Sequence, residues 1–394
     1  MRNKSGSVLM VTRELAGDRR YGIGRSLMPV VDALRQRGWQ VRYLCQEDLP
    51  EKARMRYLQW QVRWKGVPGI QGNPTREQLV AACLERWFMG WFAARVAQAE
   101  KYQTVHLHDP WLAFGFYVGV LLLRLHSVRW GLTEHGFGSY SRATHEDGLL
   151  QGHRAQRWLR RMEAWVLSKA HFVTAPTHLA LQQLARDLAL PSMPAHWVAI
   201  GHTVADVPTR NRTQARCHLG WMESDLVVLG VGRLVPLKRF DLLVDACAAL
   251  TSRYPSLRLV LLGDGDSQGL IARAEQTALA GRVQCLSVPD VWPYYAGADI
   301  YVSTSSTESF GLANFEALLS GLPCVCTAVG GVPEVMGEGA WLVPVDLDAV
   351  GSAVEALLGS VVQRNLWAQR AQARSCKVFD TAAVVDAYVA VYST

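Results

Sequence analysis

Short apolar runs alternate with longer segments of helical periodicity along most of the chain. In the first half, the apolar runs predict strands over residues 7–12, 40–45, 104–107, 130–134 and 171–174. Amphipathic patterns between them predict helices over residues 25–37 and 156–168. Strands that alternate with helices at this spacing favour a parallel sheet with helices on both faces. The first half is therefore predicted to be a doubly wound α/β unit.

The same alternation starts again after residue 205. It predicts strands over residues 226–231, 257–262, 283–286, 300–303 and 323–327, and helices over residues 240–250, 269–280 and 314–320. The segment 204–212 contains Pro208, Thr209 and Asn211, which is typical of a linker. We therefore expect two doubly wound domains, residues 1–205 and 206–375, with a cleft between them. Ligands of such sheets bind beyond the carboxyl ends of the strands, so the loops that follow the strands are where chemistry is expected.

The composition supports folded domains and excludes a disordered or collagen-like chain. Of the 394 residues, 49% are hydrophobic and 19% are charged, which is enough apolar material for sizeable cores. The eight cysteines form no CxxC pair, which disfavours a zinc ribbon, and free thiols fit a reducing cytoplasm. The longest uncharged apolar stretch, residues 111–123, is shorter than the roughly 18 residues of a membrane-spanning helix and predicts a buried core helix. No signal peptide is recognised, so we expect a soluble cytoplasmic protein.

Positive charge is concentrated in the first half. Residues 1–205 contain 27 Lys and Arg against 15 Asp and Glu, a balance of +12, whereas the remainder carries −5. Basic and aromatic residues interleave over residues 52–65 and again over residues 154–165. Such segments suit a solvated basic surface with Trp packed beneath it, or the anionic headgroups of a membrane surface to which the protein binds peripherally. Nucleic acid is the weaker alternative because no nucleic-acid-binding module is recognised.

Two glycine-containing loops are weak candidates for a phosphate site. Gly22 and Gly24 lie between the first strand and the first helix, where glycine lets a phosphate approach backbone N–H groups. An ordinary turn is the alternative. The segment Gly263–Asp266 has the wrong spacing for a dinucleotide fingerprint, and two aspartates would repel a pyrophosphate, so it is interpreted as a turn.

A stronger candidate follows the first strand of the second half. Arg233 and Lys238 leave this strand at the edge where ligands are expected. Arginine offers a planar fork of donors and lysine a point charge, so the pair can hold a diphosphate.

The most informative segment is residues 303–318, in which a strand, a polar loop and a helix follow one another. Free backbone N–H groups around Phe310, Gly311 and Leu312 would bind an anion or sugar hydroxyls. Glu308 lies in the loop and Glu316 on the helix, so one can face a reacting centre while the other binds a ribose. Helix capping by these carboxylates is the alternative.

These segments resemble the retaining, nucleotide-sugar-dependent glycosyltransferases of family 4, which have the GT-B fold of two facing Rossmann-like domains. The resemblance is densest in GVGRLVPLKRFDLLVDA, VLLGDGD and STSSTESFGLANFEALLSGLPCVCTAVGGVPEVMGEGAWLVP, with its ExxxxxxxE spacing. In the first half GIGRSLMPVVDALRQRGWQV, VHLHDPW and TEHGFG are similar to the family's glycine-rich loop and later strand ends.

The resemblance implies a role for each matching residue. Arg233 and Lys238 would neutralise the donor diphosphate, with Gly22 and Gly24 facing it across the cleft. Glu308 would lie beside the donor sugar and Glu316 would bind the nucleotide ribose. The backbone of Phe310, Gly311 and Leu312 would contact sugar and phosphate. His135 would lie near the transferred sugar, and the last helix, at about residues 376–394, would cross back onto the first domain.

Two segments depart from the family pattern. Residues 201–206 stand where relatives have an Asn-Gly-Val-Asp linker, and residues 51–76 have no assignable family role.

The sequence therefore predicts transfer of a hexose-type sugar from a nucleoside diphosphate donor to an acceptor hydroxyl, with retention and without a metal or other cofactor. The acceptor is expected to be a glycan or lipid-linked, as in the synthesis of envelope polysaccharide, lipopolysaccharide or glycolipid. The alternatives are a nucleotide-sugar epimerase or a sucrose-type synthase on the same fold, and a non-catalytic carbohydrate-binding protein. A dinucleotide oxidoreductase is disfavoured because neither half contains GxGxxG after a strand.

Overall fold

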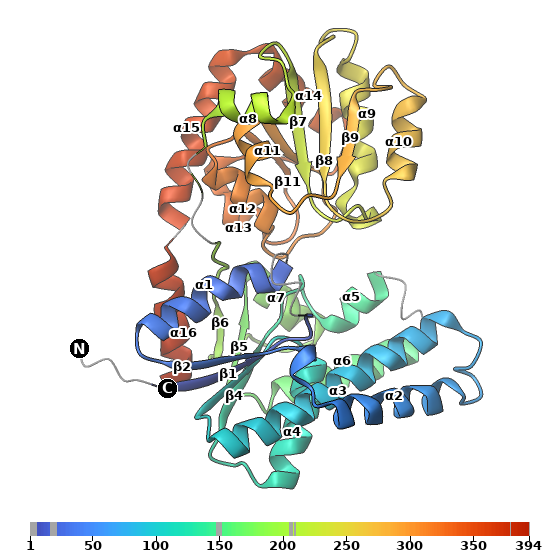
Figure 1. The fold of residues 1–394 in the computed structure, drawn as a ribbon, viewed down its shortest axis with the longest axis vertical. Coiled ribbons are helices and arrows are strands. Elements are labelled where there is room, and N and C mark those ends of the chain that lie inside the picture. The colour runs from blue at the N-terminus through green and yellow to red at the C-terminus, as the bar shows by residue number, and fades with distance from the viewer. Residues whose placement is uncertain are drawn as a thin grey trace. The chain divides into compact units, whose positions relative to one another are not determined.

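The computed structural model describes residues 6–15, 22–146, 152–204, 208, 210–378 and 380–393. The chain forms two compact units (Figure 1). Unit 1 comprises Met1–Thr203 and Thr381–Thr394, and unit 2 comprises Val204–Asp380. The predicted domain boundary falls at residues 205 and 206, which lie outside the described residues.

Unit 1 contains a six-stranded sheet in the order β2-β1-β3-β4-β5-β6, and all of its paired strands are parallel. Its strands are β1 (Ser7–Val11), β2 (Gln40–Leu44), β3 (Thr104–Leu107), β4 (Arg129–Thr133), β5 (Phe172–Ala175) and β6 (Trp197–Ala199). The connecting elements are α1 (Gly22–Gln36), η2 (Gln46–Asp48), α2 (Glu51–Lys65), α3 (Pro74–Glu100), α4 (Pro110–Leu123), α5 (Tyr140–Glu146), α6 (His153–Leu167) and α7 (His178–Asp187). The C-terminal helix α16 (Thr381–Ser393) completes this unit by packing on α1.

Alternation along the strands gives unit 1 two cores. In β1, Val8 and Met10 pack with residues of α1 and α16, whereas Leu9 and Val11 pack on the other face with α3 and α4. A strand that is apolar on both sides is typical of a parallel sheet covered by helices on both faces. The doubly wound architecture predicted for this half is therefore confirmed.

Unit 2 repeats this plan with a second all-parallel sheet in the order β12-β11-β10-β7-β8-β9. Its strands are β7 (Leu226–Val231), β8 (Leu257–Leu262), β9 (Val283–Leu286), β10 (Ile300–Ser303), β11 (Cys324–Thr327) and β12 (Trp341–Val343). Its helices are α8 (Arg212–Leu219), η3 (Pro236–Lys238), α9 (Phe240–Leu250), α10 (Gln268–Glu275), α11 (Trp292–Gly297), α12 (Leu312–Leu319), α13 (Val332–Met336), η4 (Gly337–Gly339), α14 (Leu347–Gly359) and α15 (Val361–Val378). Leu259 and Leu261 of β8 face one core, and Val260 and Leu262 face the other.

The helix expected over residues 111–123 is α4, which contributes eight buried residues, although Leu121 and Leu122 at its end are exposed. Within the described part of the chain, no helix combines the length and the apolar character that crossing a bilayer requires.

Candidate functional site

The loop that follows β7 and the loop that follows β10 are bound to each other in unit 2. The Thr304 hydroxyl lies 3.0 Å from the carbonyl oxygen of Lys238 and 2.8 Å from that of Arg239, and the Ser306 N–H donates to the carbonyl of Leu237 over 2.8 Å. Both strands end at the same edge of the sheet, since β7 and β10 are parallel neighbours. This edge therefore holds the 233–239 and 304–311 segments together.

An ion pair between Lys238 and Glu308 lies at the centre of this edge. Lys238 Nζ contacts Glu308 Oε2, and the Ser305 hydroxyl lies 3.4 Å from the same carboxylate oxygen. The two side chains are 23% and 17% exposed, so the pair is sheltered but remains open to a ligand. A lysine held here can give up part of this pairing to an incoming diphosphate.

Arg233 is the second cation of the site. Its side chain is exposed, and none of the described residues forms an ion pair or hydrogen bond with it. It leaves the carboxyl end of β7 five residues before Lys238. The guanidinium therefore offers all its donors to an anion at this edge.

Two glycines fix the backbone around Glu308. Gly330 has φ +55°, and a Cβ atom there would lie 1.9 Å from the carbonyl oxygen of Glu308, which also accepts a hydrogen bond from the Gly331 N–H. Gly311 has φ +79° and is the N-cap residue of α12. Both positions need a left-handed backbone that glycine adopts without strain. The structural role of Gly330 was not predicted, although two successive glycines after a strand are a signal for close backbone approach.

The N-terminus of α12 follows directly. No side chain caps it, which leaves the first-turn N–H groups around Leu312 without a side-chain acceptor among the described residues. The Phe310 side chain is buried and packs edge-on against Phe315, with the ring centroids 5.3 Å apart. Phe310 thus anchors the loop through its side chain, and Gly311 and Leu312 present backbone to the edge of the sheet.

Glu316 lies farther along α12 and is buried. The Tyr295 hydroxyl of α11 lies 3.2 Å from Glu316 Oε2 and 3.0 Å from the carbonyl of Ala313. Next to it, the Tyr301 hydroxyl donates to Asn314 Oδ1 over 2.7 Å. Glu316 is therefore held in place by the core, in contrast to Glu308 in the loop, so the two glutamates have different surroundings, as their spacing suggested.

The acidic side chains of the turn Gly263–Asp266 are exposed and form local hydrogen bonds. Asp264 accepts a hydrogen bond from the Ser287 hydroxyl, and Asp266 Oδ1 accepts one from the Gln268 N–H over 2.9 Å. Across the described residues, no group of three or more His, Cys, Asp or Glu side chains is arranged as a metal site.

In unit 1 the strand ends carry imidazoles. His108 Nδ1 lies 3.0 Å from His135 Nε2, and the rings of His135 and His202 stack with centroids 5.5 Å apart. His106, on β3, hydrogen-bonds Thr133 and Tyr392, each over 2.7 Å. The resemblance singled out His135 alone. The His-x-His spacing at the end of β3 could have identified His106 and His108, because residues two apart share a face of a strand, whereas no such signal marks His202.

Burial keeps these imidazoles uncharged. Burial, and then the neighbouring rings, lower the pKa of His108 and His135 well below the usual range. Burial lowers the pKa of His106 to about 3 and that of His202 to about 4. Neutral imidazoles donate at one nitrogen and accept at the other, so this edge suits uncharged hydroxyl groups.

Buried acids lie beside the imidazoles and were not predicted from the sequence. Burial, and then the nearby Glu163 and Asp109, raise the pKa of Glu134 well above its usual range. Burial also raises the pKa of Glu163 to about 8, although it accepts hydrogen bonds from the N–H groups of Tyr140 and Ser141. Asp109 pairs with Arg86 over 2.9 Å.

The glycines of the first loop lie in a helix, which corrects the predicted start of that helix. Helix α1 begins at Gly22 rather than at residue 25, so Gly22 and Gly24 both belong to its first turn. The Gly24 N–H donates to Glu14 Oε1 over 2.9 Å, and the Tyr43 hydroxyl donates to Glu14 Oε2 over 2.8 Å. A carboxylate therefore satisfies one N–H group of the N-terminus of α1, where negative charge is stabilising.

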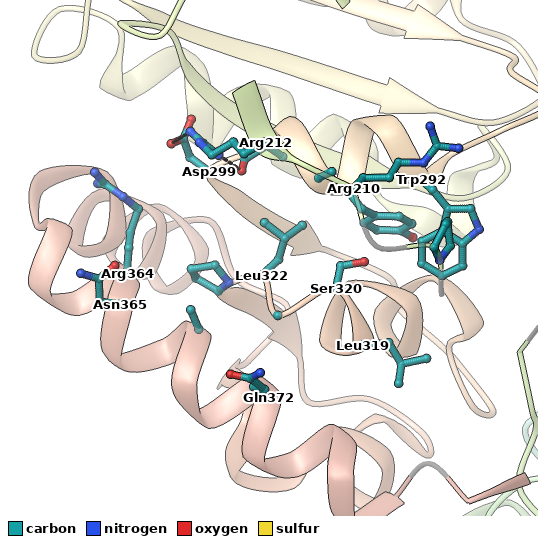
Figure 2. A pocket seen from close by; sticks show the side chains of 17 residues that line it. Arg210, Arg212, Trp292, Asp299, Leu319, Ser320, Leu322, Arg364, Asn365 and Gln372 are labelled. Atoms are coloured by element: carbon teal, nitrogen blue, oxygen red, sulfur yellow. Dashed lines mark hydrogen bonds and ion pairs between the residues drawn. The ribbon is translucent and has the colours of Figure 1, made fainter. Parts of the chain in front are cut away.

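A cavity of about 780 Å³ lies at the opposite, amino-terminal ends of β10 and β11 (Figure 2). Two of its three arginines form ion pairs, Arg210 with Asp290 and Arg212 with Asp299, over 2.6 and 2.7 Å, and Arg364 donates to backbone carbonyl oxygens of α14. It lies away from the loops that carry Lys238 and Glu308. We therefore do not assign the donor site to this cavity.

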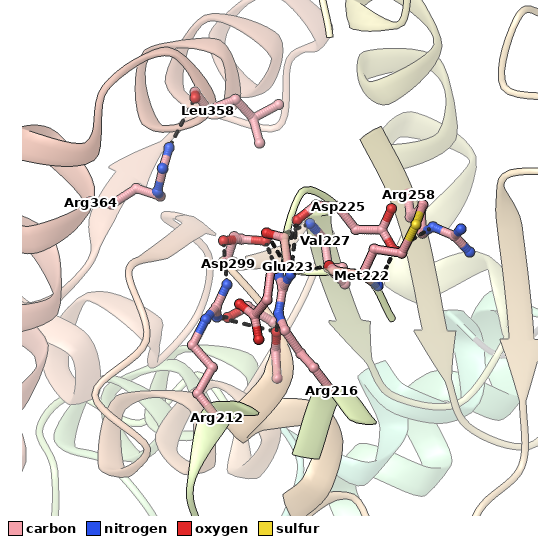
Figure 3. A network of polar contacts seen from close by, with 12 residues as sticks. Arg212, Arg216, Met222, Glu223, Asp225, Val227, Arg258, Asp299, Leu358 and Arg364 are labelled. Carbon is pink, nitrogen blue, oxygen red and sulfur yellow. Dashed lines mark hydrogen bonds and ion pairs between the residues drawn. The ribbon is translucent and has the colours of Figure 1, made fainter. Parts of the chain in front are cut away.

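A buried polar network borders that cavity (Figure 3). Arg216, only 1% exposed, donates to Asp299 Oδ2 over 2.7 Å and to the carbonyl oxygens of Gly297, Met222 and Asp225. The Val227 N–H donates to the same Asp299 oxygen over 2.7 Å. Arg216 shares Asp299 with Arg212 and places its other donors on carbonyl oxygens, so the network fixes α8 against β7 and β10 and has a structural role.

Both halves match family models. Residues 21–201 match "Glycosyl transferase 4-like domain" and residues 211–374 match "Glycosyl transferases group 1". A D-inositol 3-phosphate glycosyltransferase of Mycobacterium sp. (strain KMS) is 31% identical over 279 residues, 66% of this chain and 60% of that protein. The match thus spans less than two thirds of that relative.

Solved structures show the same fold. Sucrose-phosphate synthase from Thermosynechococcus elongatus is 20% identical with a TM-score of 0.76, and 98% of each chain is covered. Anabaena HepE in complex with UDP-glucose is 17% identical with a TM-score of 0.71, covering 98% of this chain and 99% of that one. With two parallel doubly wound sheets and both family domains in order, the chain belongs to the family 4 type of glycosyltransferases with the GT-B fold.

Proposed function

We propose that the protein transfers a hexose-type sugar from a nucleoside diphosphate sugar to an acceptor hydroxyl. The observation that carries this proposal is the sheltered Lys238–Glu308 pair beside the uncapped N-terminus of α12. Breaking the bond to the sugar creates an oxocarbenium-like sugar and a diphosphate leaving group. Cations and helix N–H groups aimed at the diphosphate stabilise the charge that develops in the transition state.

The residues divide this work as follows. Arg233 and Lys238 bind the diphosphate, and the backbone of Gly311 and Leu312 contacts sugar and phosphate. Glu308 lies beside the donor sugar, and Glu316, held by Tyr295, accepts hydrogen bonds from the ribose. The proposal assigns the diphosphate charge to these groups rather than to a metal, so transfer is expected to persist in EDTA.

We further propose that transfer proceeds with retention, by attack on the face from which the diphosphate leaves, with the leaving phosphate accepting the acceptor's proton. Stereochemistry is checked by NMR of the initial product, and an inverted anomeric centre would contradict this part.

The acceptor is proposed to be a glycan or a lipid-linked glycan in envelope polysaccharide, lipopolysaccharide or glycolipid synthesis. The basic unit 1 supports it, since a positively charged surface attracts anionic envelope components. The eight cysteines are all free, which fits work in the cytoplasm. An epimerase or sucrose-type synthase remains the second candidate, because the first solved structure named above is a sucrose-phosphate synthase.

The test combines binding and chemistry. A thermal-shift screen of UDP-, GDP- and ADP-sugars identifies the donor, because a ligand that binds only the native state raises Tm. The donor is then incubated with and without acceptor mixtures, and release of nucleoside diphosphate is measured. Donor binding without release of nucleoside diphosphate in any mixture would favour a non-catalytic binding protein and contradict the proposal.

A further inference from the structure

Helix α2 lies at the periphery of unit 1, in the segment 51–76 that has no assignable family role. It packs along α3 (Figure 1), and its contact side carries Ala53, Tyr57 and Gln61, whose side-chain amide donates to the carbonyl of Ala81 over 3.0 Å. None of its residues is buried. A helix that uses only one row of side chains for packing leaves the rest of its surface for another purpose.

An apolar stripe runs along the exposed side of α2. Met55, Leu58 and Val62 are 52%, 39% and 73% exposed. Their spacing of three and four residues places them on one face of a helix, roughly opposite the row that contacts α3. Trp60 and Trp64, 45% and 41% exposed, lie on the other side of the helix, beside the row that contacts α3.

Basic side chains border this stripe on both sides. The helix contains five Lys and Arg residues and one acidic residue, Glu51. Successive residues of a helix are rotated by 100°, which places Arg54 and Lys65 on one side of the stripe and Lys52, Arg56 and Arg63 on the other. Among the described residues, none of these five forms an ion pair. No ion pair within the described part of the chain therefore neutralises this positive charge.

We propose that α2 docks on an anionic lipid surface, with Met55, Leu58 and Val62 inserted at the headgroup boundary and the flanking Lys and Arg at the level of the phosphates. Apolar faces bordered by cations are what interfacial helices present to such membranes. Docking on such a surface rests on the proposed action on a lipid-linked acceptor, but vesicle binding can be measured without any sugar transfer.

A second copy of the chain is a poorer occupant of the same face. Two α2 helices would bring ten cations against each other with two acidic residues between them, which opposes association. Nucleic acid fits the cations but not an apolar stripe at their centre. Anionic lipid satisfies both features.

Helix α6 has the other basic–aromatic face, but its tryptophans are partly engaged. Trp158 contacts Trp111, and Trp165 contacts Phe114 and Tyr117. The stripe of α2 instead consists of three aliphatic side chains that are 39% to 73% exposed, so α2 is the better candidate for insertion.

The experiment is sedimentation of the full chain with phosphatidylcholine vesicles and with vesicles of phosphatidylcholine and phosphatidylglycerol. The protein is expected to bind the anionic vesicles at low salt and to bind neutral vesicles at least about tenfold more weakly. The variant Met55→Ser/Leu58→Ser/Val62→Ser is expected to lose binding by about tenfold or more, as is Lys52→Gln/Arg56→Gln/Arg63→Gln.

A matched control is Val361→Ser/Val362→Ser/Leu366→Ser, which removes three exposed apolar side chains from α15 in unit 2 and should leave vesicle binding unchanged. Circular dichroism and nucleotide-sugar thermal shift check that each variant is folded. Donor turnover without vesicles should be unchanged in the α2 variants, which separates this inference from the proposed function. The docking proposal is overturned if the wild type and the α2 variants bind vesicles equally. It is also overturned if the protein binds no vesicles and instead dimerises or binds RNA through α2.

Discussion

The carboxyl-terminal edges of the two sheets differ in their electrostatics, since one carries charged side chains and the other carries neutral imidazoles. Beyond the carboxyl ends of β7 and β10, unit 2 presents Arg233, Lys238 and Glu308, all exposed or partly exposed. Beyond β3 and β4, unit 1 presents His108 and His135, whose pKa values burial lowers. One architecture thus provides a charged edge suited to a diphosphate and an uncharged edge suited to hydroxyl groups. The difference arises from the loops and not from the sheets.

The largest effect is expected at the charged edge. Replacing Lys238 by Ala removes the cation paired with Glu308 and should lower kcat for transfer by about 10²–10³-fold, the range for loss of one preorganised charge-stabilising contact. Steady-state kinetics with the donor identified by thermal shift measure it. Arg273→Ala is the control, because it breaks an ion pair with Asp245 on the surface of the same unit.

A double-mutant cycle sharpens this test. Because Lys238 and Glu308 contact each other, Lys238→Ala/Glu308→Ala should cost much less than the product of the two single effects. Full activity in Lys238→Ala, or strictly independent effects in the cycle, would remove the role assigned to the pair.

The second prediction concerns pH and separates the two units. In the unfolded chain, histidines become protonated below about pH 6.5. In the folded protein, burial keeps four of them neutral, namely His106, His108, His135 and His202. Each of these histidines therefore lowers the free energy of unfolding as pH falls. Glu134 and Glu163 have the opposite effect because their pKa values are raised in the folded protein. Each raises the free energy of unfolding as pH falls toward about 4.5. Because the four imidazoles outnumber the two carboxyls, the free energy of unfolding is expected to fall between about pH 6.5 and about pH 5, by about 1.4 kcal/mol per pH unit for each net proton taken up on unfolding.

Unit 2 provides the internal control, because residues 204–380 contain a single histidine, His218. Hydrogen exchange followed by mass spectrometry at about pH 7 and about pH 5 should show unit 1 opening at the lower pH while unit 2 keeps its protection. Equal loss of protection in both units would contradict the contribution assigned to the imidazoles.

The third prediction tests the backbone at Glu308. Gly330→Ala places a Cβ atom against the Glu308 carbonyl in a left-handed backbone, whereas Gly321→Ala, at φ +68°, meets nothing within 4 Å. The left-handed backbone alone should lower the free energy of unfolding by about 1 kcal/mol in either variant. The clash should lower it by about 2 kcal/mol more in Gly330→Ala. Urea unfolding measures both variants, and equal stabilities would show that the loop relaxes freely.

The sequence predicted the charged edge better than the uncharged one, for physical reasons. Strands β7 and β8 and helix α9 were predicted at their exact bounds, because apolar runs end in Gly or Pro or in charged residues. Arg233 and Lys238 were recognisable as cations directly after a strand. The start of α1 was predicted three residues late, because no local sequence signal indicates that Glu14, ten residues before Gly24, accepts a hydrogen bond from its N–H group. The partners of His135 come from separate strands and loops and meet only through tertiary packing.

The smallest effect is expected at His135, and it bears most directly on the uncharged edge. His135→Ala removes a neutral imidazole that hydrogen-bonds His108 and stacks on His202, and it should lower transfer by about tenfold, as loss of one neutral hydrogen bond does. His126→Ala, an exposed histidine of the same unit, is the matched control. Because the imidazole is already neutral near pH 7, the remaining activity should keep the wild-type pH profile above about pH 6.5. A shift of the pH profile in His135→Ala would mean that the imidazole changes charge during turnover. The edge of unit 1 would then also carry charge, and the two edges would differ only in that this charge is buried in unit 1 and exposed in unit 2.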